Sequence, residues 1–320
     1  MTRRAILRGV GHYLPERVVE NAEMETMVDT TDAWIKTRSG IERRHFAADG
    51  QLTSDLAVRA AQAALADAGM QATDIDAVVV ATSTPDTTFP SVATIVQGKL
   101  ATSGFAFDVQ AVCAGFVYAM ATANSFIQSG QSQRVLVIGA ETFSRIMNWE
   151  DRTTCVLFGD GAGAVVLEAE DGAGETGILA TDLNSDGRFR DLLYVDGGVS
   201  STQTTGVLVM QGKEVFRHAV EKLAQTAETA LERAGLTSDD VDWIVPHQAN
   251  SRIITRTAQK MNVPMERVVM TVQDHGNTSA ASIPLALSVA KQDGKFKPGQ
   301  VLVMEAIGGG LAWGAVVLRL

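Results

Sequence analysis

The sequence predicts an α/β protein built from two related halves. Residues 64–80 run from an alanine-rich helix through a glycine stop and a short acidic loop into a buried apolar strand, and residues 230–245 repeat this order. The glycines that end the two helices, Gly69 and Gly235, are 166 residues apart (235 − 69). Helix, glycine and buried strand in this order are typical of α/β folds. Because chance similarity rarely holds one register over such a distance, we expect two pseudo-symmetric halves.

Further strands extend the correspondence. The apolar strands at 135–138 and 301–304 keep the 166-residue offset. The terminal strands at 163–167 and 314–318 match at a smaller offset, so the first half carries extra residues near 141–157. Each match reads as a buried strand of four or five apolar residues.

The boundary between the halves is predicted near 169–175, where the hydrophobic periodicity is lost. We therefore divide the chain into residues 1–171 and residues 172–320. Residues 184–206 are rich in Gly, Ser, Asp and Thr, which predicts a long excursion beside the second half.

Composition and charge exclude several classes of protein. Of the 320 residues, 46% are hydrophobic, and the net charge of −10 argues against generic binding to nucleic acid or to an anionic membrane. The two cysteines, Cys113 and Cys155, form no metal-binding spacing and fit a reducing compartment. The apolar run at the N-terminus is broken at Arg8, too early for a signal peptide, and no segment is long enough to cross a membrane. We expect a soluble, cytoplasmic protein without a metal.

Cys113 follows an apolar strand at 105–109 and begins a helix. A thiol at a helix N-terminus faces free backbone N–H groups and the positive end of the helix dipole, which favour the nucleophilic thiolate. Far downstream, His247 and Asn277 supply an imidazole and an amide. Such a set suggests acyl transfer through a thioester, whereas a lone cysteine is more often a small buried hydrophobe.

The internal repeat groups these residues. At the 166-residue offset, Cys113 corresponds to Ser279 and His247 corresponds to Ala81. The candidates therefore lie at equivalent ends of equivalent strands, where open α/β sheets bind their ligands. We expect Cys113, His247 and Asn277 to meet in one cleft between the halves.

An ordered set of motifs runs along the whole chain: residues 30–41, the segment around Cys113, residues 158–164, the His247 and Asn277 motifs, and residues 308–314. This set resembles the β-ketoacyl-acyl-carrier-protein synthase III family of the thiolase-like superfamily. The resemblance implies a five-layer αβαβα fold and a homodimer. It also implies condensation of an acyl-CoA starter, acetyl-CoA being the one expected, with malonyl-acyl carrier protein. The products are 3-oxoacyl-acyl carrier protein, CO₂ and CoA, and the reaction initiates fatty acid synthesis without a cofactor.

The resemblance also implies roles for the site residues. Cys113 takes the acyl group, and the backbone N–H groups of Cys113 and Gly309 hold the oxyanion. His247 and Asn277 donate hydrogen bonds to the thioester oxygen during decarboxylation. Whether His247 also acts as a base toward Cys113 stays open. His275 is read as a neighbour of Asn277.

Binding residues carried over from the family fall into three groups. CoA and its pantetheine arm are assigned to Trp34, Arg38, Arg152 and Asn250. Phe89 is expected to cross the dimer interface and close the partner's acyl pocket. The acidic carrier protein is assigned to a basic surface, because Arg252, Arg256 and Lys260 recur on one face of a helix. The full docking set comprises Arg217, Gln248, Ala249, Asn250, Ser251, Arg252, Arg256 and Lys260.

Several alternatives remain at this point. A related condensing enzyme that primes polyketide or quinolone synthesis would carry the same catalytic residues. A dinucleotide-binding protein is disfavoured because the glycine-rich residues 158–163 run into a strand and not into a helix. A thiolase would need a second catalytic cysteine where this chain has Gly308–Gly310. A scaffold without activity is disfavoured because the three catalytic residues are all present. We read His12, His45, His218 and Cys155 as structural or surface residues.

Overall fold

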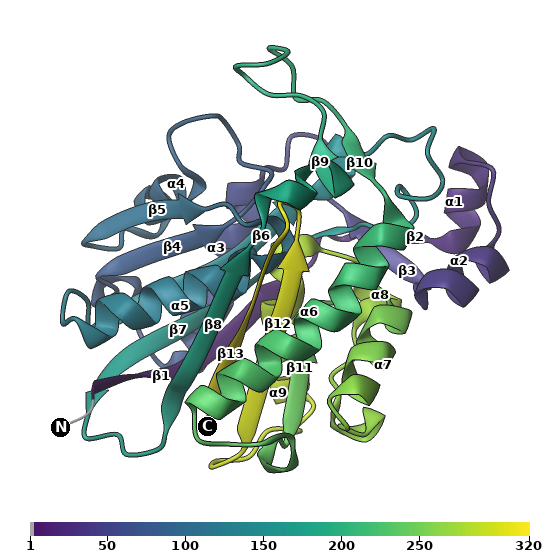
Figure 1. Cartoon of the computed structure of the whole chain (residues 1–320). Coiled ribbons are helices and arrows are strands. Elements are labelled where there is room, and N and C mark those ends of the chain that lie inside the picture. The colour runs from purple at the N-terminus through teal and green to yellow at the C-terminus, as the bar shows by residue number, and fades with distance from the viewer. Residues whose placement is uncertain (1–2) are drawn as a thin grey trace.

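The computed structural model describes residues 3–320, so residues 1 and 2 of the predicted first half lie outside the described residues. A five-stranded sheet has the order β1-β7-β6-β4-β5 (Figure 1). Its strands β1, β4, β5, β6 and β7 span Arg3–Tyr13, Ala77–Ala81, Phe105–Val109, Arg134–Thr142 and Asp160–Asp171. β1 and β7 pair antiparallel to their neighbours, whereas β4, β5 and β6 run parallel.

A four-stranded sheet with the order β11-β12-β13-β8 repeats this topology. Its strands β8, β11, β12 and β13 span Gly177–Ser185, Trp243–Pro246, Val301–Gly308 and Ala312–Arg319. They stand in the places of β1, β4, β6 and β7 of the first sheet, with the same parallel and antiparallel pairings. The counterpart of β5 is reduced to a single bridge between Ile244 and Val268.

Six helices complete five layers, which confirms the predicted αβαβα architecture. α3 and α4 pack on the outer face of the first sheet, α5 and α9 lie between the two sheets, and α6 and α7 cover the outer face of the second. Their bounds are Thr53–Ala68, Val92–Leu100, Gly115–Gln128, Ser282–Gln292, Gly212–Arg233 and Ser251–Lys260, in the order α3, α4, α5, α9, α6 and α7. The buried core around α5 and α9 takes side chains from both sheets. The division of the chain into two domains at 171/172 therefore stays a prediction.

Small residues allow these layers to approach closely. A Cβ on Gly9 or Gly11 of β1 would lie 2.3 or 2.2 Å from backbone atoms of Ala64 in α3. The helix offers mostly alanines on this face, so glycine and alanine set the separation between α3 and the sheet.

Smaller elements lie along the edge that carries the site. The two-stranded sheet β2-β3 pairs residues Arg17–Glu20 with Arg43–Phe46 and is flanked by α1 (Asn21–Met27), α2 (Asp32–Ser39) and α8 (Val272–His275).

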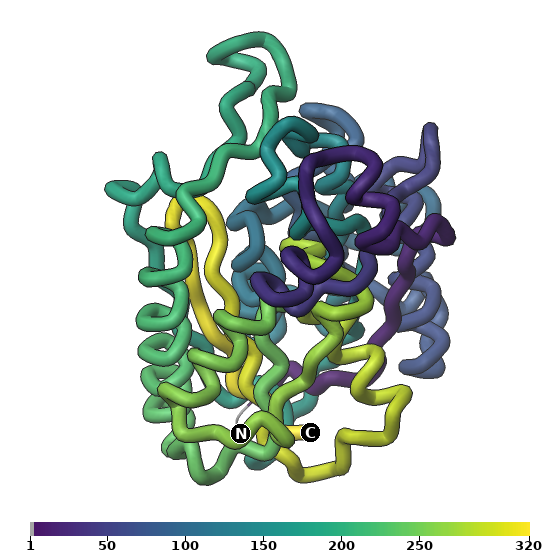
Figure 2. The backbone as a smooth tube through the Cα atoms, turned by 90° about the vertical axis from the view of Figure 1, so that its right-hand side faces the viewer, coloured from purple at the N-terminus to yellow at the C-terminus, as the bar shows by residue number. Residues whose placement is uncertain are grey.

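The segment predicted to be an excursion, 184–206, leaves β8 and forms a short 3₁₀ helix at Gly187–Leu192 and the strand β9 (Leu193–Val195). β9 pairs with β10 (Leu208–Met210), and the loop between them projects from the body of the molecule (Figures 1 and 2).

The repeat departs from the 166-residue offset by one residue at the turns that open its two central helices. The turn before α5 opens at Val112 (φ 49°), and the turn before α9 opens at Ser279 (φ 50°), a separation of 167 residues (279 − 112). Cys113 therefore occupies the place of Ala280, and the predicted pairing of Cys113 with Ser279 is wrong by one position. The sequence offset was measured on segments where no residue is inserted, so it missed this shift.

No helix within residues 3–320 combines the length and the apolar character that a membrane span requires.

Gly139 of β6 is a point where the halves touch, because a Cβ there would lie 2.2 Å from the carbonyl oxygen of Ala280. We expect Gly139→Ala to lower the free energy of unfolding by about 1–3 kcal/mol, the usual cost of overpacking. Gly98→Ala is the matched control, because Gly98 lies within α4 with open space at its Cβ and should gain about 0.5–1 kcal/mol. Urea denaturation of both variants measures the effect, and equal stability of the two would contradict the close contact.

Candidate active site

Cys113 lies in a 3₁₀ turn, Val112–Ala114, that connects β5 to the central helix α5. Cys113 is 4% exposed. The left-handed φ of the preceding Val112 turns the chain sharply, so that the thiol stands at the helix N-terminus and at the carboxyl ends of the parallel strands. This placement is the one that the sequence predicted.

His247 follows β11 and is held from two sides. Its backbone N–H donates to the carbonyl oxygen of Glu305 at 2.8 Å, and its Nδ1 lies 2.7 Å from Ser282 Oγ. The same Oγ accepts a hydrogen bond from the N–H of Gln248 at 3.2 Å, and its hydroxyl proton can point to Nδ1. In this arrangement His247 carries its own proton on Nε2.

Asn277 is fixed by backbone and side-chain bonds. Its N–H donates to Leu157 at 2.8 Å, and its carbonyl oxygen accepts from Gly159 at 3.0 Å. The side-chain Oδ1 accepts from the N–H of Ser279 at 2.9 Å. Because the oxygen is engaged, the amide Nδ2 remains as the group that can donate to a ligand.

A fully buried arginine supports the segment beside Asn277. Arg44 donates to the carbonyl oxygen of Val156 at 2.7 Å and to Asn21 Oδ1 at 2.8 Å. Its stem also fills the space beside Gly159 and Gly276, where an added Cβ would lie 3.0 and 3.1 Å from Arg44 Cβ. Arg44 thus helps to hold the segment that carries the amide.

The structure brings Cys113, His247 and Asn277 to one cavity of about 490 Å³. Apolar side chains from both halves line its walls, including Leu193 and Phe216. A sulfur, a protonated ring nitrogen and an amide therefore face a shared space.

The ionisation of Cys113 differs from the prediction. The pKa of the Cys113 thiol is raised to about 12, mainly by burial; the nearby Ser279 hydroxyl lowers it and the carboxyl of Glu141 contributes to the rise. The desolvation cost of the anion outweighs the helix N-terminus on which the prediction relied. The thiol is neutral at physiological pH and must lose its proton during the reaction.

His247 is also neutral. Burial lowers the pKa of its imidazole to about 3, because the low-dielectric surroundings disfavour the cation. The ring can donate from Nε2, but it does not hold a second proton at neutral pH.

The glycine turn after β12 packs against the nucleophile. A Cβ on Gly308 would lie 2.6 Å from the backbone nitrogen of Cys113, and one on Gly309 would lie 2.7 Å from the carbonyl oxygen of Leu193. Only glycine permits this approach of backbone to backbone. The oxyanion role of Gly309 and of the Cys113 N–H stays a prediction that this packing suits.

Trp34 stands at the mouth of the cavity between two arginines. The guanidinium carbons of Arg38 and Arg152 lie 4.8 and 5.4 Å from the centroid of its indole ring. Trp34 and Arg38 line the cavity, whereas Arg152 reaches out to Asp29. The three residues predicted from different parts of the chain thus form one cationic, aromatic cluster.

Asn250 lines the cavity and also begins α7, where its Oδ1 accepts a hydrogen bond from the N–H of Ile253 at 3.0 Å. This N-cap accounts for the oxygen of its side chain. The amide nitrogen of Asn250 remains for a ligand.

The docking residues separate into exposed and buried ones. Arg252 lines the mouth of the cavity and lies 5.5 Å over the ring of Phe216, while Arg256 and Lys260 follow on the exposed face of α7. Arg217 pairs with Glu214 on the neighbouring helix α6. Ala249 is part of the cavity wall, and Ser251 is half-buried where α7 begins.

Gln248 does not belong to this surface, and its assignment to carrier docking is wrong. Its side chain is buried, donates to the carbonyl oxygens of Pro246 and Val269, and accepts from the N–H groups of Thr271 and Val272. These bonds use the whole amide to fix the loop after His247.

Phe89 lies on the loop between β4 and α4 and is 82% exposed. A smaller cavity of about 300 Å³ begins beside Val112, the neighbour of Cys113, and is lined by residues of the β9 segment. The role of Phe89 in a dimer stays a prediction.

The remaining histidines and cysteine have structural surroundings. His275 is buried, and burial, together with the charges of His12 and His45, lowers its pKa to about 3. His218 packs on the ring of Phe189 at 4.4 Å. Cys155 is buried in the core beneath β2 and β3. Within residues 3–320 no group of three His, Cys, Asp or Glu side chains is placed to hold a metal ion.

Sequence reasoning missed several residues of the site. Ser282, Ser279 and Glu141 lie behind the catalytic groups, and Lys213 adds a cation to the cavity lining. Serines in loops and a carboxylate at the end of a strand carry no signal in one sequence. The packing of the two halves brings Ser279 and Glu141 close to the thiol and Ser282 to His247.

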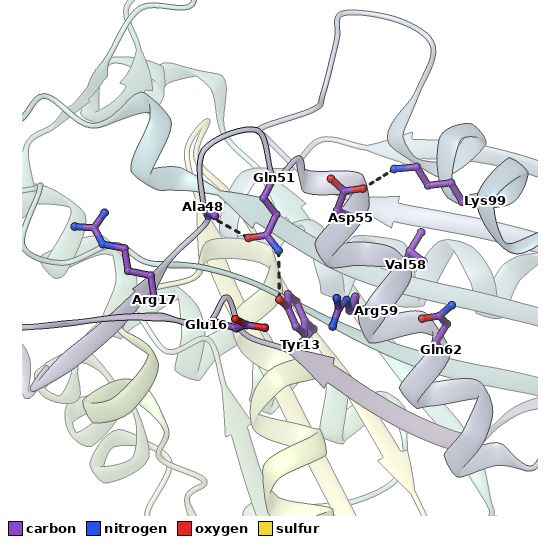
Figure 3. A pocket seen from close by; sticks show the side chains of 10 residues that line it. All are labelled: Tyr13, Glu16, Arg17, Ala48, Gln51, Asp55, Val58, Arg59, Gln62 and Lys99. Atoms are coloured by element: carbon purple, nitrogen blue, oxygen red, sulfur yellow. Dashed lines mark hydrogen bonds and ion pairs between the residues drawn. The ribbon is translucent and has the colours of Figure 1, made fainter.

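A second, polar cavity of about 510 Å³ lies away from these residues, beside α3 (Figure 3). Gln51 accepts from the N–H of Ala48 at 3.1 Å and donates to Tyr13 at 3.3 Å, and Lys99 pairs with Asp55 at 2.7 Å. Its polar groups largely satisfy one another, and the predicted catalytic residues do not line it.

Comparison with protein families agrees with the geometry. Residues 107–187 match the family described as 3-oxoacyl-[acyl-carrier-protein (ACP)] synthase III, and residues 231–320 match its C-terminal part. The chain is 74% identical over 323 residues to β-ketoacyl-[acyl-carrier-protein] synthase III of Cereibacter sphaeroides and 73% identical to that of Dinoroseobacter shibae. Both alignments cover 100% of each chain.

Solved structures show the same fold. The crystal structure of 3-oxoacyl-[acyl-carrier-protein] synthase III from Aquifex aeolicus has a TM-score of 0.94 at 45% identity, covering 99% of this chain and 100% of that chain. A priming β-ketosynthase of the R1128 polyketide pathway has the same TM-score at 36% identity, covering 100% and 97%. The enzymes from Cereibacter sphaeroides and Dinoroseobacter shibae are far more similar to this chain than the polyketide enzyme is. The comparison therefore does not favour the polyketide alternative. The chain belongs to the β-ketoacyl-acyl-carrier-protein synthase III family of condensing enzymes.

Proposed function

We propose that Cys113, His247 and Asn277 carry out the condensation that this family performs, with an acyl-CoA starter and malonyl-acyl carrier protein. The observation that carries the proposal is their convergence on one cavity whose mouth is cationic. Acetyl-CoA is the starter we expect, and decarboxylation supplies the carbanion without a further cofactor.

In the first half-reaction, Cys113 attacks the carbonyl carbon of the acyl-CoA thioester, and CoA leaves. The oxyanion forms beside the Cys113 turn and the glycine turn that packs on it. Backbone N–H groups of Cys113 and Gly309 suit this charge because they are fixed before the reaction begins.

In the second half-reaction, malonyl-acyl carrier protein loses CO₂ and leaves an enolate. His247 and Asn277 line the cavity with Cys113, and His247 Nε2 and Asn277 Nδ2 have no other partner among the residues described, so both can serve as donors. A neutral imidazole is suited to this task, since it donates a hydrogen bond without delivering its proton to the carbanion. The carbanion then attacks the acyl group on Cys113.

CoA binding is assigned to the cluster at the mouth. The indole of Trp34 offers a face for stacking the adenine, and the guanidinium groups of Arg38 and Arg152 offer charge to the phosphates. Lys213 and Arg252, which also line the cavity, extend this positive rim.

The acidic carrier protein is assigned to the exposed face of α7. Arg252, Arg256 and Lys260 form a row there that begins at the cavity mouth. On a chain with net charge −10, a local positive row steers an acidic partner to one place.

A homodimer in the cytoplasm is the assembly we expect. β5 is an edge strand of the first sheet, and Phe89 lies on a neighbouring loop with most of its surface exposed. A second copy that covers this edge would bury Phe89 near the smaller cavity beside Val112. Such an arrangement makes the acyl pocket a shared property of two chains.

Cys113→Ala should abolish acyl-enzyme formation, because no thiol then remains in the cavity. Incubation with several acyl-CoAs and malonyl-acyl carrier protein, followed by mass spectrometry of protein and products, tests the assignment. Cys155→Ala is the matched control, since it removes the other buried thiol outside the cavity. Continued acylation of Cys113→Ala, or acylation without a condensed product in the wild type, would refute the proposed function.

Arg256→Glu should raise the KM for malonyl-acyl carrier protein about tenfold, since it places a negative charge in the docking row. Arg256 is a better test than Arg252, because only Arg252 also lines the cavity that receives CoA. Arg59→Glu makes the same charge change on α3, beside the second cavity. Steady-state kinetics against each substrate distinguish the two. An equal KM in both variants would count against the docking surface.

Phe89→Ala should alter the range of acyl-CoA lengths accepted, if Phe89 closes the partner's pocket. Met27→Ala, another exposed apolar residue on α1, serves as the control. Acylation rates with a series of acyl-CoAs and the mass in solution by light scattering report both properties. A monomeric wild type, or a Phe89→Ala variant with an unchanged range of acyl-CoA lengths, would contradict an acyl pocket shared by two chains.

A further inference from the structure

Ser282 is the first residue of the central helix α9 and lies behind His247, outside the lining of the active-site cavity. It is 2% exposed, and its Oγ lies 2.7 Å from His247 Nδ1. The same Oγ accepts a hydrogen bond from the backbone N–H of Gln248 at 3.2 Å. The hydroxyl therefore contacts both the ring of His247 and the loop that follows it.

The buried imidazole of His247 has one proton to place. Burial lowers its pKa to about 3, so at neutral pH the ring is neutral and carries its proton on either Nδ1 or Nε2. Backbone bonds do not settle this choice, because the N–H of His247 donates to Glu305 and its carbonyl oxygen accepts from Ala249. Among the residues described, the ring itself is hydrogen-bonded only through Nδ1, to Ser282.

The two tautomers use the Ser282 hydroxyl differently. With the proton on Nε2, the hydroxyl donates to Nδ1 while it accepts from Gln248, so the ring nitrogen and the hydroxyl both have a partner. With the proton on Nδ1, the ring donates to Oγ, and the hydroxyl proton is left without an acceptor within residues 3–320. A buried donor without a partner is unfavourable, so the contact selects the Nε2–H tautomer.

The segment that leads to Ser282 engages Asn277 in the same way. Asn277 Oδ1 accepts from the backbone N–H of Ser279 at 2.9 Å, which occupies the acceptor and leaves Nδ2 as the donor. The segment is held in place by its close packing on Gly139, where a Cβ would lie 2.2 Å from the carbonyl oxygen of Ala280. It thus binds the acceptor atom of each catalytic side chain and leaves the donor for the cavity.

We propose that Ser282 is a positioning residue that fixes His247 in the Nε2–H tautomer. It acts through the ring and does not touch the reacting atoms. This inference rests on the proposed function, in which Nε2–H stabilises the enolate that decarboxylation leaves. An imidazole held in this tautomer presents no lone pair to the Cys113 thiol, so His247 serves the second half-reaction and is not the base of the first.

The tautomer can be measured without any reaction. In protein labelled with ¹⁵N in its five histidines, NMR of the ring nitrogens distinguishes a protonated Nε2 from a protonated Nδ1, and His247→Gln identifies the His247 signals. We expect the wild-type ring to carry its proton on Nε2. In Ser282→Ala the signals should shift toward a mixture of the two tautomers. A wild-type ring protonated on Nδ1 would overturn the proposal before any variant is made.

The two half-reactions are then measured separately in wild type and Ser282→Ala. Acyl-enzyme formation from acetyl-CoA alone, followed by rapid quench and mass spectrometry, should keep the wild-type rate, because it does not use the Nε2 proton. Release of CO₂ from malonyl-acyl carrier protein by the preformed acyl-enzyme should slow by about tenfold, since part of the protein then lacks one of the two donors to the enolate. His247→Ala removes this donor entirely and should slow the release by about 100-fold.

Ser288→Ala is the matched control. Ser288 lies on the same helix and is also buried, and its Oγ lies 2.8 Å from His12 Nδ1, but neither residue lines the active-site cavity. Loss of this hydroxyl should leave both half-reactions unchanged. Ser282→Thr keeps a hydroxyl at the position and should recover both the CO₂ release and the Nε2–H signal.

The outcomes separate this inference from the proposed function. A wild type that forms no acyl-enzyme on Cys113 would overturn the proposed function, while the NMR signals still decide whether Ser282 fixes the tautomer. A Ser282→Ala variant with unchanged His247 signals and unchanged CO₂ release would overturn the role of Ser282 alone. Equal slowing of both half-reactions in Ser282→Ala would also overturn it, because a general disturbance of the cavity would then explain the loss.

Discussion

Backbone contacts that only glycine permits hold the two halves at the distance on which the site depends. Gly139 of the first sheet packs on Ala280 of the second half, and Gly308 of the second sheet packs on the Cys113 turn of the first. These contacts are reciprocal, because each half presents a glycine to the turn that opens the other half's central helix. A larger residue at either point would move the nucleophile relative to the imidazole and the amide.

Burial gives the cavity its second property, which is the neutrality of its reactive groups. The thiol of Cys113 and the imidazole of His247 both pay a desolvation penalty in their charged forms. A neutral imidazole that donates from Nε2 suits the stabilisation of an enolate. A neutral thiol, in contrast, must lose its proton before it can attack a thioester.

The mouth of the cavity differs from its floor in exposure and charge. Here the basic residues Arg38, Lys213 and Arg252 are exposed, while the protein as a whole is acidic. Under the proposed function, substrates that carry phosphates or acidic surfaces bind at one positive rim, whereas the thioester enters the buried part of the cavity. Recognition and chemistry are separated along the depth of the cavity.

The sequence alone determined the α/β class, the repeat and the three residues that share the cavity, because small and apolar patterning, glycine stops and chemically distinctive side chains are visible in a single chain. It misjudged the ionisation of Cys113 and the exposure of Gln248, since both depend on which atoms surround a side chain. It gave no sign of Glu141 near the thiol, and it identified Ser279 only as the repeat counterpart of Cys113. The packing of the two sheets on the helices between them decides which residues lie beside the thiol. Residues far apart in the chain become neighbours only when these layers pack.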